Sequence, residues 1–234
     1  MAKSVNIYGD GIGKVEYVEH MGSDLSVVNS ARVSFGKHKQ VLEDNDEKLI
    51  NYLIKHRHSS TLEHCVVTFR FKVPLYVRSQ HHRHRTWSYN EISRRYTDFN
   101  LEFYEPTLFR TQHDSNRQAS NTTDLVDPLI SPELIIGSKS TCSMALKRHH
   151  KQSLKLYNDM LKAGVCREQA RGVLPQNMYT EYYGTCNLNN LLKFVDLRIH
   201  EGAQWEIQEV AKAILQIAKG LYPITVGAYE KAKK

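Results

Sequence analysis

The chain has 234 residues, of which 41% are hydrophobic and 24% are charged. This composition is typical of a folded globular protein and excludes a collagen-like or largely disordered chain. No apolar run approaches the ~20 residues that a membrane-spanning helix requires, and the first residues lack the charged and then apolar pattern of a secretory signal. We therefore expect a single cytoplasmic domain over residues 1–234, with no membrane partner.

The balance of charges indicates an anionic partner. The 32 Lys and Arg residues exceed the 25 Asp and Glu residues, which gives a net charge of +7. A surplus of this kind fits nucleic acid, a nucleotide or a dinucleotide cofactor, and charge alone leaves these three open. The four cysteines are widely spaced and form no C-x-x-C pair, so the sequence predicts neither a zinc site nor a disulfide framework.

The N-terminal part of the chain predicts a hairpin followed by two helices. Residues 4–8 and 14–19 alternate apolar and polar side chains on either side of a glycine-rich turn at 9–13. The turn has the spacing G-x-G-x-G and lacks a G-K-S/T, so we interpret it as a hairpin turn and not as a phosphate-binding loop. Helices are expected over 24–32 and 46–56, the second with the spacing of an amphipathic helix.

The next part predicts one strong strand and a helix that carries many polar groups. Residues 65–73 are rich in β-branched and aromatic side chains and predict the clearest strand of the chain. Pro74 ends it. Because proline suits the first turn of a helix, we expect a helix from 75 to about 85 that leads into a loop at 89–91.

The remainder predicts an exposed segment followed by helices. Residues 111–124 contain almost nothing that packs in a core, so we expect them to be exposed and without a catalytic role. They lie within a loop or insertion expected at about 107–138. Helical patterns then cover 139–163, 167–171, 189–200 and 204–219. The last of these is expected to stop at Gly220 and Pro223, before a solvated end at 231–234.

The segment 80–95 concentrates groups that bind anions. It holds four arginines and three histidines beside neutral donors and acceptors. A guanidinium pairs bidentately with phosphate and keeps its charge at any relevant pH. From the residues alone, three interpretations stay open: a solvated basic face, a nucleic-acid surface and a small-molecule site. The histidines lack a further ligand pattern, so no metal site is expected.

The order of these residues resembles a known family. Arg83, His84 and Arg85, then seven residues and Ser93, are similar to the R-H-R-x7-S signature of flavin-dependent thymidylate synthases, and residues 88–96 match its extended form S-x-N-E-x-S-x-R-Y. Further segments similar to the family are 31–35, 58–64, 170–175, 197–198 and 203–206. The resemblance covers most of the chain, but not about 107–138. It implies an α+β fold, an antiparallel sheet covered by helices, and a homotetramer with sites between subunits.

The resemblance also implies a reaction. It is the reductive methylation of dUMP to dTMP, with 5,10-methylenetetrahydrofolate as carbon donor and NADPH-reduced FAD as hydride source. The Pro-Cys nucleophile dipeptide of the better-known thymidylate synthase is absent from the sequence, so no cysteine nucleophile is expected. The cofactor carries the difficult step, and the protein positions the reactants and stabilises charge. Nucleic acid is not an expected partner, and a flavoprotein with another one-carbon donor is the alternative.

The resemblance assigns roles residue by residue. Arg198 matches the catalytic arginine, which polarises uracil and stabilises its N3 anion. The residues that match dUMP-binding positions are Gln80, Arg83, Glu91, Ser93, Arg95, Arg171 and Arg198. Those that match FAD-binding positions are Ser60, Arg83, His84, Arg85, Glu91, Asn187, Leu188, Asn189 and Lys193. Ser93 is interpreted as a phosphate ligand, since a serine nucleophile needs an adjacent general base that the sequence does not show. Asn189 stands where the family often has arginine, and Lys193 where it can have asparagine or histidine.

Overall fold

A computed structural model describes residues 3–131 and 139–233. Its centre is a five-stranded antiparallel sheet. The strands follow the order β1 (Ser4–Asn6), β2 (Lys14–Met21), β3 (Val66–Pro74), β9 (Tyr179–Asn187) and β4 (Ser88–Glu91). The predicted α+β fold with an antiparallel sheet is confirmed.

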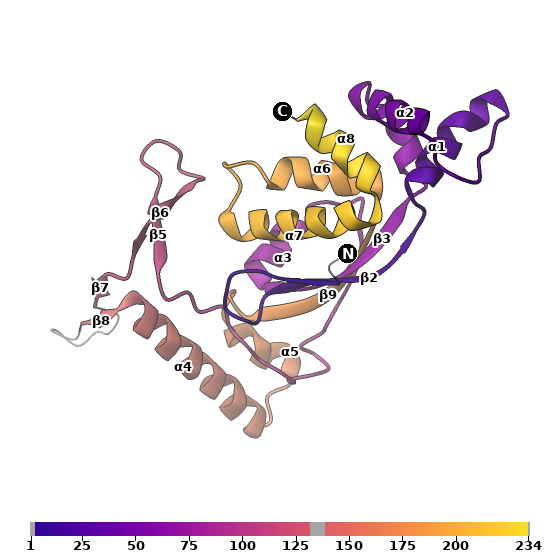
Figure 1. Ribbon diagram of the computed structural model, residues 1–234. Coiled ribbons are helices and arrows are strands. Elements are labelled where there is room, and N and C mark those ends of the chain that lie inside the picture. The colour runs from indigo at the N-terminus through magenta and orange to yellow at the C-terminus, as the bar shows by residue number, and fades with distance from the viewer. Residues whose placement is uncertain (1–2, 132–138, 234) are drawn as a thin grey trace.

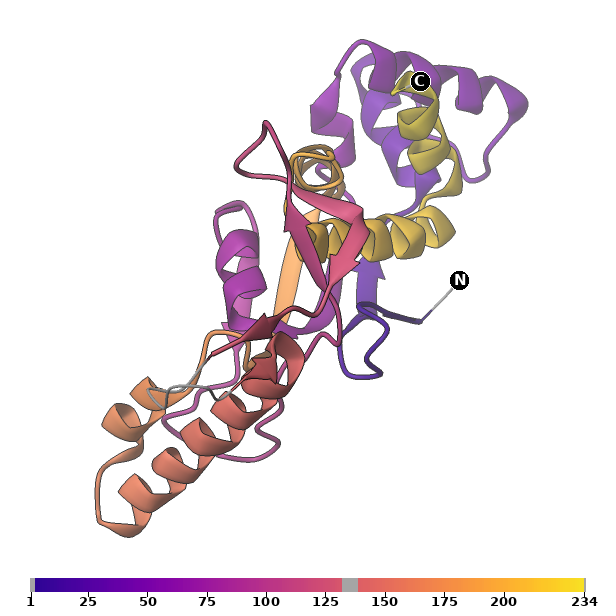
Figure 2. The same ribbon diagram turned by 90° about the vertical axis from the view of Figure 1, so that its left-hand side faces the viewer.

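Helices cover the sheet and extend beyond both ends. They are α1 (Asp24–Arg32), α2 (Asp44–Lys55), α3 (Leu75–His81), α4 (Cys142–Lys162), α5 (Arg167–Ala170), α6 (Leu188–Arg198), α7 (Trp205–Leu221) and α8 (Pro223–Ala232). Three short 3-10 segments are η1 (Val33–Phe35), η2 (Ser59–Leu62) and η3 (Arg171–Val173). In Figures 1 and 2, α6 and α7 lie over one face of the sheet, α1, α2 and α8 gather at one end, and α4 and α5 lie at the other. Within the described residues, no helix combines the length and apolarity needed to span a membrane.

The main core lies between the sheet and α6 and α7. Val67, Phe69 and Phe71 of β3 are fully buried, as period-two alternation requires for one face of a strand. Each such side chain contributes about 1.5–3 kcal/mol through burial. Gly184 of β9 permits the close packing, because a Cβ there would stand 2.9 Å from the Phe71 ring and 3.3 Å from the Trp87 ring.

The predicted N-terminal hairpin, helices and strand are confirmed. β1 and β2 pair antiparallel with Val5 opposite Val15. α1 has the predicted bounds, α2 begins two residues before the predicted 46, and β3 is shifted by one residue from the predicted 65–73.

The prediction of a helix from 75 to about 85 is wrong at its C-terminal end, because α3 stops at His81. The Tyr89 hydroxyl donates to the backbone carbonyls of His81 at 2.9 Å and His84 at 3.2 Å. These bonds satisfy carbonyls that a longer helix would have used. The predicted loop at 89–91 is also wrong, since these residues belong to β4, which pairs with β9.

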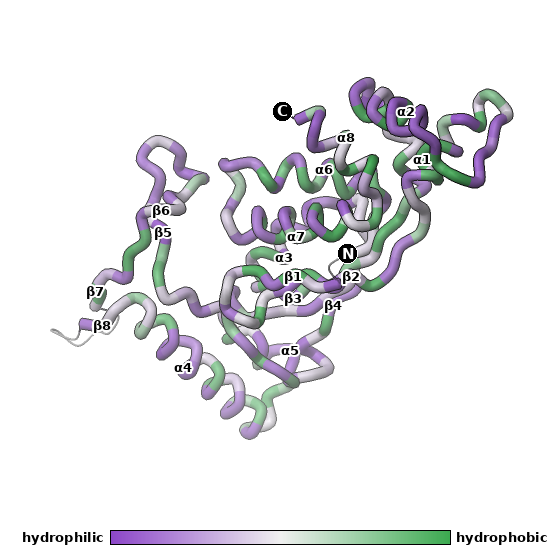
Figure 3. Tube along the Cα trace, in the orientation of Figure 1, coloured by the Kyte–Doolittle hydropathy of each residue, from purple (hydrophilic) through white to green (hydrophobic). Residues whose placement is uncertain are grey.

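The polar segment 111–124 was expected to be a loop, and much of it is strand instead. β5 (Phe109–Gln112) and β6 (Ser120–Val126) form a hairpin, the β5–β6 hairpin, whose tip is hydrophilic (Figure 3). Thr111 Oγ1 donates to Asp124 Oδ2 at 2.6 Å, and Asn121 Nδ2 donates to Thr111 Oγ1 at 3.0 Å. Polar side chains therefore satisfy one another across the strands. Two short strands, β7 (Leu129–Ile130) and β8 (Ser140–Thr141), follow. Residues 132–138 of the predicted insertion lie outside the described residues.

The C-terminal helices are confirmed with shifted ends, and two elements were missed. α4, α5, α6 and α7 correspond to the four helical patterns. β9 was not predicted although it lies between β3 and β4. The helix after Pro223 was missed too, because its N-terminus is capped from afar: the Asp24 carboxylate accepts from the backbone N–H groups of Ile224 and Thr225, both at 2.9 Å.

Candidate active site

Arg198 stands at the C-terminal end of α6, where a cation is favoured by the helix dipole. The N-cap of this helix is Asn187, whose side chain accepts from the backbone N–H of Asn190 at 2.9 Å. Arg198 Nε donates to His84 Nε2 at 3.0 Å, and its Nη2 donates to the Gln80 carbonyl at 3.3 Å. The structure thus brings together three predicted residues from two separate segments of the chain.

Burial, and then the charge of Arg198, lower the pKa of His84 to about 4. The imidazole is therefore neutral near pH 7, and since Nε2 accepts a hydrogen bond, the proton is assigned to Nδ1. Burial also lowers the pKa of Arg198, but a guanidinium remains protonated at neutral pH. Nη1 of Arg198 has no partner among the described residues, so it is available to a ligand.

The predicted nucleotide residues of β4 and its continuation make a second group. Glu91 Oε1 accepts from Thr180 Oγ1 at 2.7 Å and faces Arg78 Nε at 3.3 Å. Ser93 Oγ accepts from the backbone N–H of Arg95 at 3.3 Å. Thr180 and Arg78 were not predicted as site residues, and only their contacts with Glu91 identify them.

Several predicted arginines are exposed. Arg95 pairs with Glu168 of α5 at 3.1 Å, and both side chains are about half exposed. Arg83, Arg85 and Arg171 are exposed, and within residues 3–131 and 139–233 no acceptor pairs with their side chains. Such guanidinium groups are able to bind a phosphate without first breaking an ion pair.

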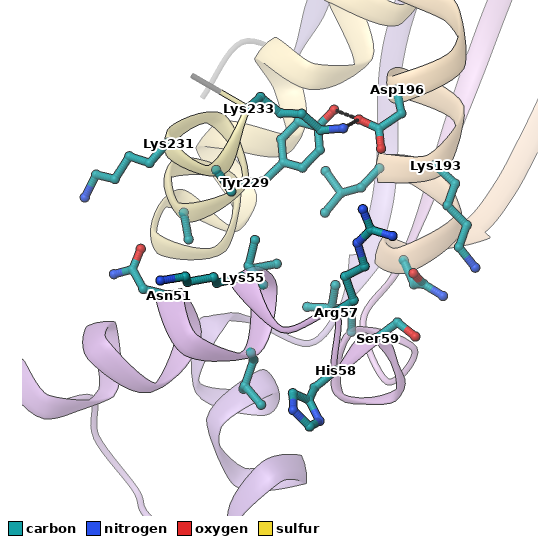
Figure 4. Close-up of a pocket in the computed structure, with 17 residues that line it drawn as sticks. Asn51, Lys55, Arg57, His58, Ser59, Lys193, Asp196, Tyr229, Lys231 and Lys233 are labelled. Atoms are coloured by element: carbon teal, nitrogen blue, oxygen red, sulfur yellow. Dashed lines mark hydrogen bonds and ion pairs between the residues drawn. The ribbon is translucent and has the colours of Figure 1, made fainter.

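A third group of predicted residues surrounds a pocket of about 840 Å³ between α2, α6, α8 and the segment that includes η2 (Figure 4). Asn189 and Lys193 line it, and Ser60 adjoins its lining residue Ser59. Asn189 is buried and its Nδ2 donates to Glu63 Oε1 at 2.8 Å. Leu188 is completely buried in the core. Its side chain is therefore not accessible to a ligand, and only its backbone could contact the flavin cofactor.

The chemistry of this pocket fits a dinucleotide such as FAD. Its volume lies within the roughly 300–1,000 Å³ typical of small-molecule sites. Its cationic lining residues are Lys55, Arg57, Lys193, Lys231 and Lys233. Its carboxylate, Asp196, is engaged by Lys233 at 2.8 Å and by the Tyr229 hydroxyl. The other predicted FAD residues, Arg83, His84, Arg85 and Glu91, do not line this pocket within the described chain.

Comparison with known proteins identifies the family. Residues 16–224 match the family described as thymidylate synthase complementing protein. The chain is 40% identical to the flavin-dependent thymidylate synthase of Thermus thermophilus over 219 residues. This match covers 94% of this chain and 76% of the relative. The chain belongs to the flavin-dependent thymidylate synthase family. The flavin-dependent thymidylate synthase of Thermotoga neapolitana is 42% identical over 219 residues, covering 94% and 91% of the two chains.

A solved structure shares the fold of this thymidylate synthase. The UMP/dUMP methylase PolB from Streptomyces cacaoi, bound with 5-Br dUMP, superposes with a TM-score of 0.76 and is 30% identical, covering 93% of this chain and 94% of the other. The predicted family, activity on dUMP and FAD cofactor are confirmed. Of the three interpretations of segment 80–95, membership in the flavin-dependent thymidylate synthase family supports the small-molecule site.

Contacts reveal further residues near Arg198 that had no predicted role. The Gln80 side-chain amide donates to Gln204 Oε1, and Gln204 in turn contacts Glu206. The sequence signal was present, because segment 203–206 resembles the family, but a segment match does not show which side chain faces the site.

Proposed function

We propose that this protein converts dUMP to dTMP by reductive methylation, and that Arg198 is the residue that activates the uracil ring. The observation that carries the assignment is the fixed guanidinium of Arg198, which is held by His84 and by the Gln80 carbonyl. Its free Nη1 is the donor that is left for the carbonyl-rich edge of uracil.

The chain's own part in the chemistry is electrostatic. A cation fixed before the reaction stabilises negative charge as it develops at uracil N3, and costs no reorganisation at that moment. The neutral His84 holds Arg198 without adding a second charge. Bound FAD, once reduced by NADPH, supplies the hydride, and 5,10-methylenetetrahydrofolate supplies the carbon.

The nucleotide's phosphate is assigned to the exposed arginines Arg83, Arg95 and Arg171, together with Ser93. Their guanidinium forks match a phosphate, and among the described residues Arg83 and Arg171 keep all of their donors free. Ser93 Oγ has no histidine or carboxylate within hydrogen-bond distance in the described chain, which supports phosphate binding over nucleophilic attack. Gln80 and Glu91 are assigned to the sugar and base.

The FAD residues are assigned to two subunits of a homotetramer. Asn187, Leu188, Asn189, Lys193 and Ser60 lie at or beside the pocket, whereas Arg83, His84, Arg85 and Glu91 do not line it. A site built between copies of the chain would unite the two groups. Exposed apolar side chains such as Phe35, which is 79% exposed, and Val33 support association.

Co-expression of two defective variants tests the shared site. Arg83→Ala and Lys193→Glu alter the two different groups, so each homotetramer is expected to be nearly inactive. If a site takes one group from each of two subunits, mixed tetramers contain some sites with both groups intact, and activity returns to about a quarter of the native value. A monomeric protein, or mixtures that stay inactive, would contradict the shared site.

Product analysis tests the proposed reaction. Purified protein is incubated with FAD, NADPH, 5,10-methylenetetrahydrofolate and dUMP, and dTMP is measured, with UMP as a parallel substrate. Arg198→Ala is expected to lose at least about a hundred-fold in kcat while it retains flavin absorbance. Lys151→Ala on the exposed face of α4 is the control. Absence of dTMP from the intact protein would refute the reaction.

A cytoplasmic location is also part of the proposal. Cys65, Cys142, Cys166 and Cys186 are free thiols, which fits a reducing compartment. Localisation of a fluorescent fusion checks it.

A further inference from the structure

A continuous series of polar contacts connects the β5–β6 hairpin with Arg198. Arg110 Nη2 donates to Glu206 Oε1 at 2.6 Å, and Gln204 Nε2 donates to Glu206 Oε2 at 2.9 Å. Gln204 Oε1 accepts from Gln80 Nε2. The Gln80 carbonyl accepts from Arg198 Nη2 at 3.3 Å. Residues far apart in the sequence thus form one chain of contacts.

Glu206 is the unusual member of this series, because it is a carboxylate with only 4% of its surface exposed. Removing a charge from water costs several kcal/mol unless a partner and hydrogen bonds compensate. Arg110 is that partner, and its guanidinium also lies over the Trp205 ring, 5.0 Å from the centroid. Arg110 Nε donates to Ser120 Oγ at 2.9 Å, which ties the charge to both strands of the hairpin.

The backbone around Glu206 is fixed as well. The Tyr8 hydroxyl donates to the Glu206 carbonyl at 3.0 Å, and the rings of Tyr8 and Trp205 lie 5.9 Å apart. The first turn of α7 is therefore anchored to the N-terminal hairpin. An apolar side chain would fill this position without the desolvation cost of a charge, so a carboxylate here indicates a directional role.

The direction follows from hydrogen-bond chemistry. An ionised carboxylate only accepts, so the Gln204 side chain must turn its NH₂ group toward Glu206 and its oxygen toward Gln80. Gln80 must then turn its NH₂ group toward Gln204. Its Oε1, which has no partner among the described residues, is left as an acceptor. The charge at Glu206 thereby sets the orientation of two amides.

We propose that Glu206, fixed by Arg110, is a positioning residue that makes Gln80 present an acceptor to dUMP and steadies the carbonyl on which Arg198 rests. The inference depends on the proposed roles of Gln80 and Arg198. The matching donor on dUMP is the sugar hydroxyl, because negative charge develops at uracil N3 in the proposed reaction. The β5–β6 hairpin, which was expected to have no catalytic role, acts on the site through Arg110.

Glu206→Gln tests this directly, because an amide of nearly the same shape is able to donate as well as accept. The side-chain amides of Gln204 and Gln80 are then free to exchange the positions of their NH₂ group and oxygen. We expect the dissociation constant of dUMP to rise about ten-fold, as for loss of one hydrogen bond between neutral groups, while FAD binding is unchanged. Glu209→Gln is the matched control, since Glu209 lies on the same helix and its one ion pair among the described residues is with Lys212 at 2.7 Å.

Gln204→Met provides a second variant in case Glu206→Gln fails to fold. It leaves the Arg110–Glu206 ion pair intact and removes the Gln204 amide that donates a hydrogen bond to Glu206. Binding of dUMP to the FAD-loaded protein is measured by calorimetry, which does not require turnover. Weaker binding in Gln204→Met, with an unchanged melting temperature, supports the inference. Native dUMP affinity and kcat in this variant would overturn it. Absence of dTMP formation by the native enzyme would instead refute the proposed reaction, and the two failures are distinguishable.

Discussion

Arg198 at the end of α6 donates its Nε–H to His84 Nε2 at 3.0 Å, so a permanent cation is held by an imidazole that must be neutral to accept the bond. The two residues are more than a hundred positions apart in the sequence. Their contact joins the R-H-R signature to the residue assigned to uracil activation, and it makes the site sensitive to protonation.

Protonation of His84 is expected to destabilise the folded protein. Its pKa is about 4 when folded and about 6.5 when unfolded, so between these values the unfolded chain binds more protons. The stability is complete above pH 6.5 and is lost as the pH falls toward 4. Allowing for the half-exposed ring, the free energy of unfolding should fall by roughly 1 kcal/mol between pH 7 and 5 because of this residue.

Urea unfolding at the two pH values measures this loss. His81 and His82 also have lowered pKa values, chiefly through burial, so the native protein shows their combined slope. His84→Asn should reduce the slope. An identical slope in His84→Asn and the native protein would argue against a depressed pKa of His84.

Asp46 is expected to stabilise the start of α2. Burial alone would raise its pKa, but hydrogen bonds from Lys39, the Glu43 backbone and Arg32 lower it to about 2. Lys39 Nζ lies 3.0 Å from Oδ2 and Arg32 Nη2 lies 2.6 Å from Oδ1. Asp46→Asn leaves Arg32 without its countercharge and Lys39 with Glu43 alone, at 2.9 Å, and should cost about 2 kcal/mol.

Chemical unfolding at pH 7 tests this change against Asp44→Asn, an exposed residue of the same first turn. Because the folded pKa of Asp46 is depressed, its contribution is present above about pH 4 and is lost as the pH falls toward 2. Equal stability of Asp46→Asn and Asp44→Asn would show that the buried charge of Asp46 contributes nothing.

The packing at Gly184 gives a prediction for the sheet. Gly184→Ala places a Cβ 2.9 Å from the Phe71 ring, and overpacking of this kind costs about 1–3 kcal/mol. Gly227→Ala is the opposite case, since nothing lies within 4 Å of its Cβ in α8 and alanine favours a helix by about 1 kcal/mol. The melting temperature should therefore fall in the first variant and rise in the second. A melting temperature that shifts in the same direction in both variants would contradict the packing argument.

The sequence predicts elements whose signals are local. The hairpin, α1, α2 and β3 carry their periodicity and caps within a few residues, and the R-H-R-x7-S spacing is linear. α8 could not be predicted in this way, because its N-terminal cap is Asp24, about 200 positions away. β9 was missed although its tyrosines and threonines favour a strand. Gly184 weakens the local pattern, and its place depends on Phe71 across the strand pair.

The same distinction applies to the candidate site. Arg198 and His84 were found by motif position, whereas Glu206 and Arg110 are joined by a contact across 96 positions. A polar segment such as 111–124 has no local pattern of burial, so its pairing as a hairpin, and the contact of the adjacent Arg110 with α7, follow only from tertiary contacts.

The basic pocket gives a prediction for FAD binding. Arg57 points into the pocket toward Tyr229 and Asp196 in Figure 4, and its side chain has no ion pair within the described residues. Because a dinucleotide carries two phosphates, Arg57→Ala should raise the dissociation constant of FAD about five-fold and reduce its dependence on salt. Titration followed by flavin fluorescence measures both. Lys212→Ala, whose partner is Glu209 on the surface of α7, is the control for loss of one positive charge. Equal FAD affinities in the two variants would place the FAD phosphates away from this pocket.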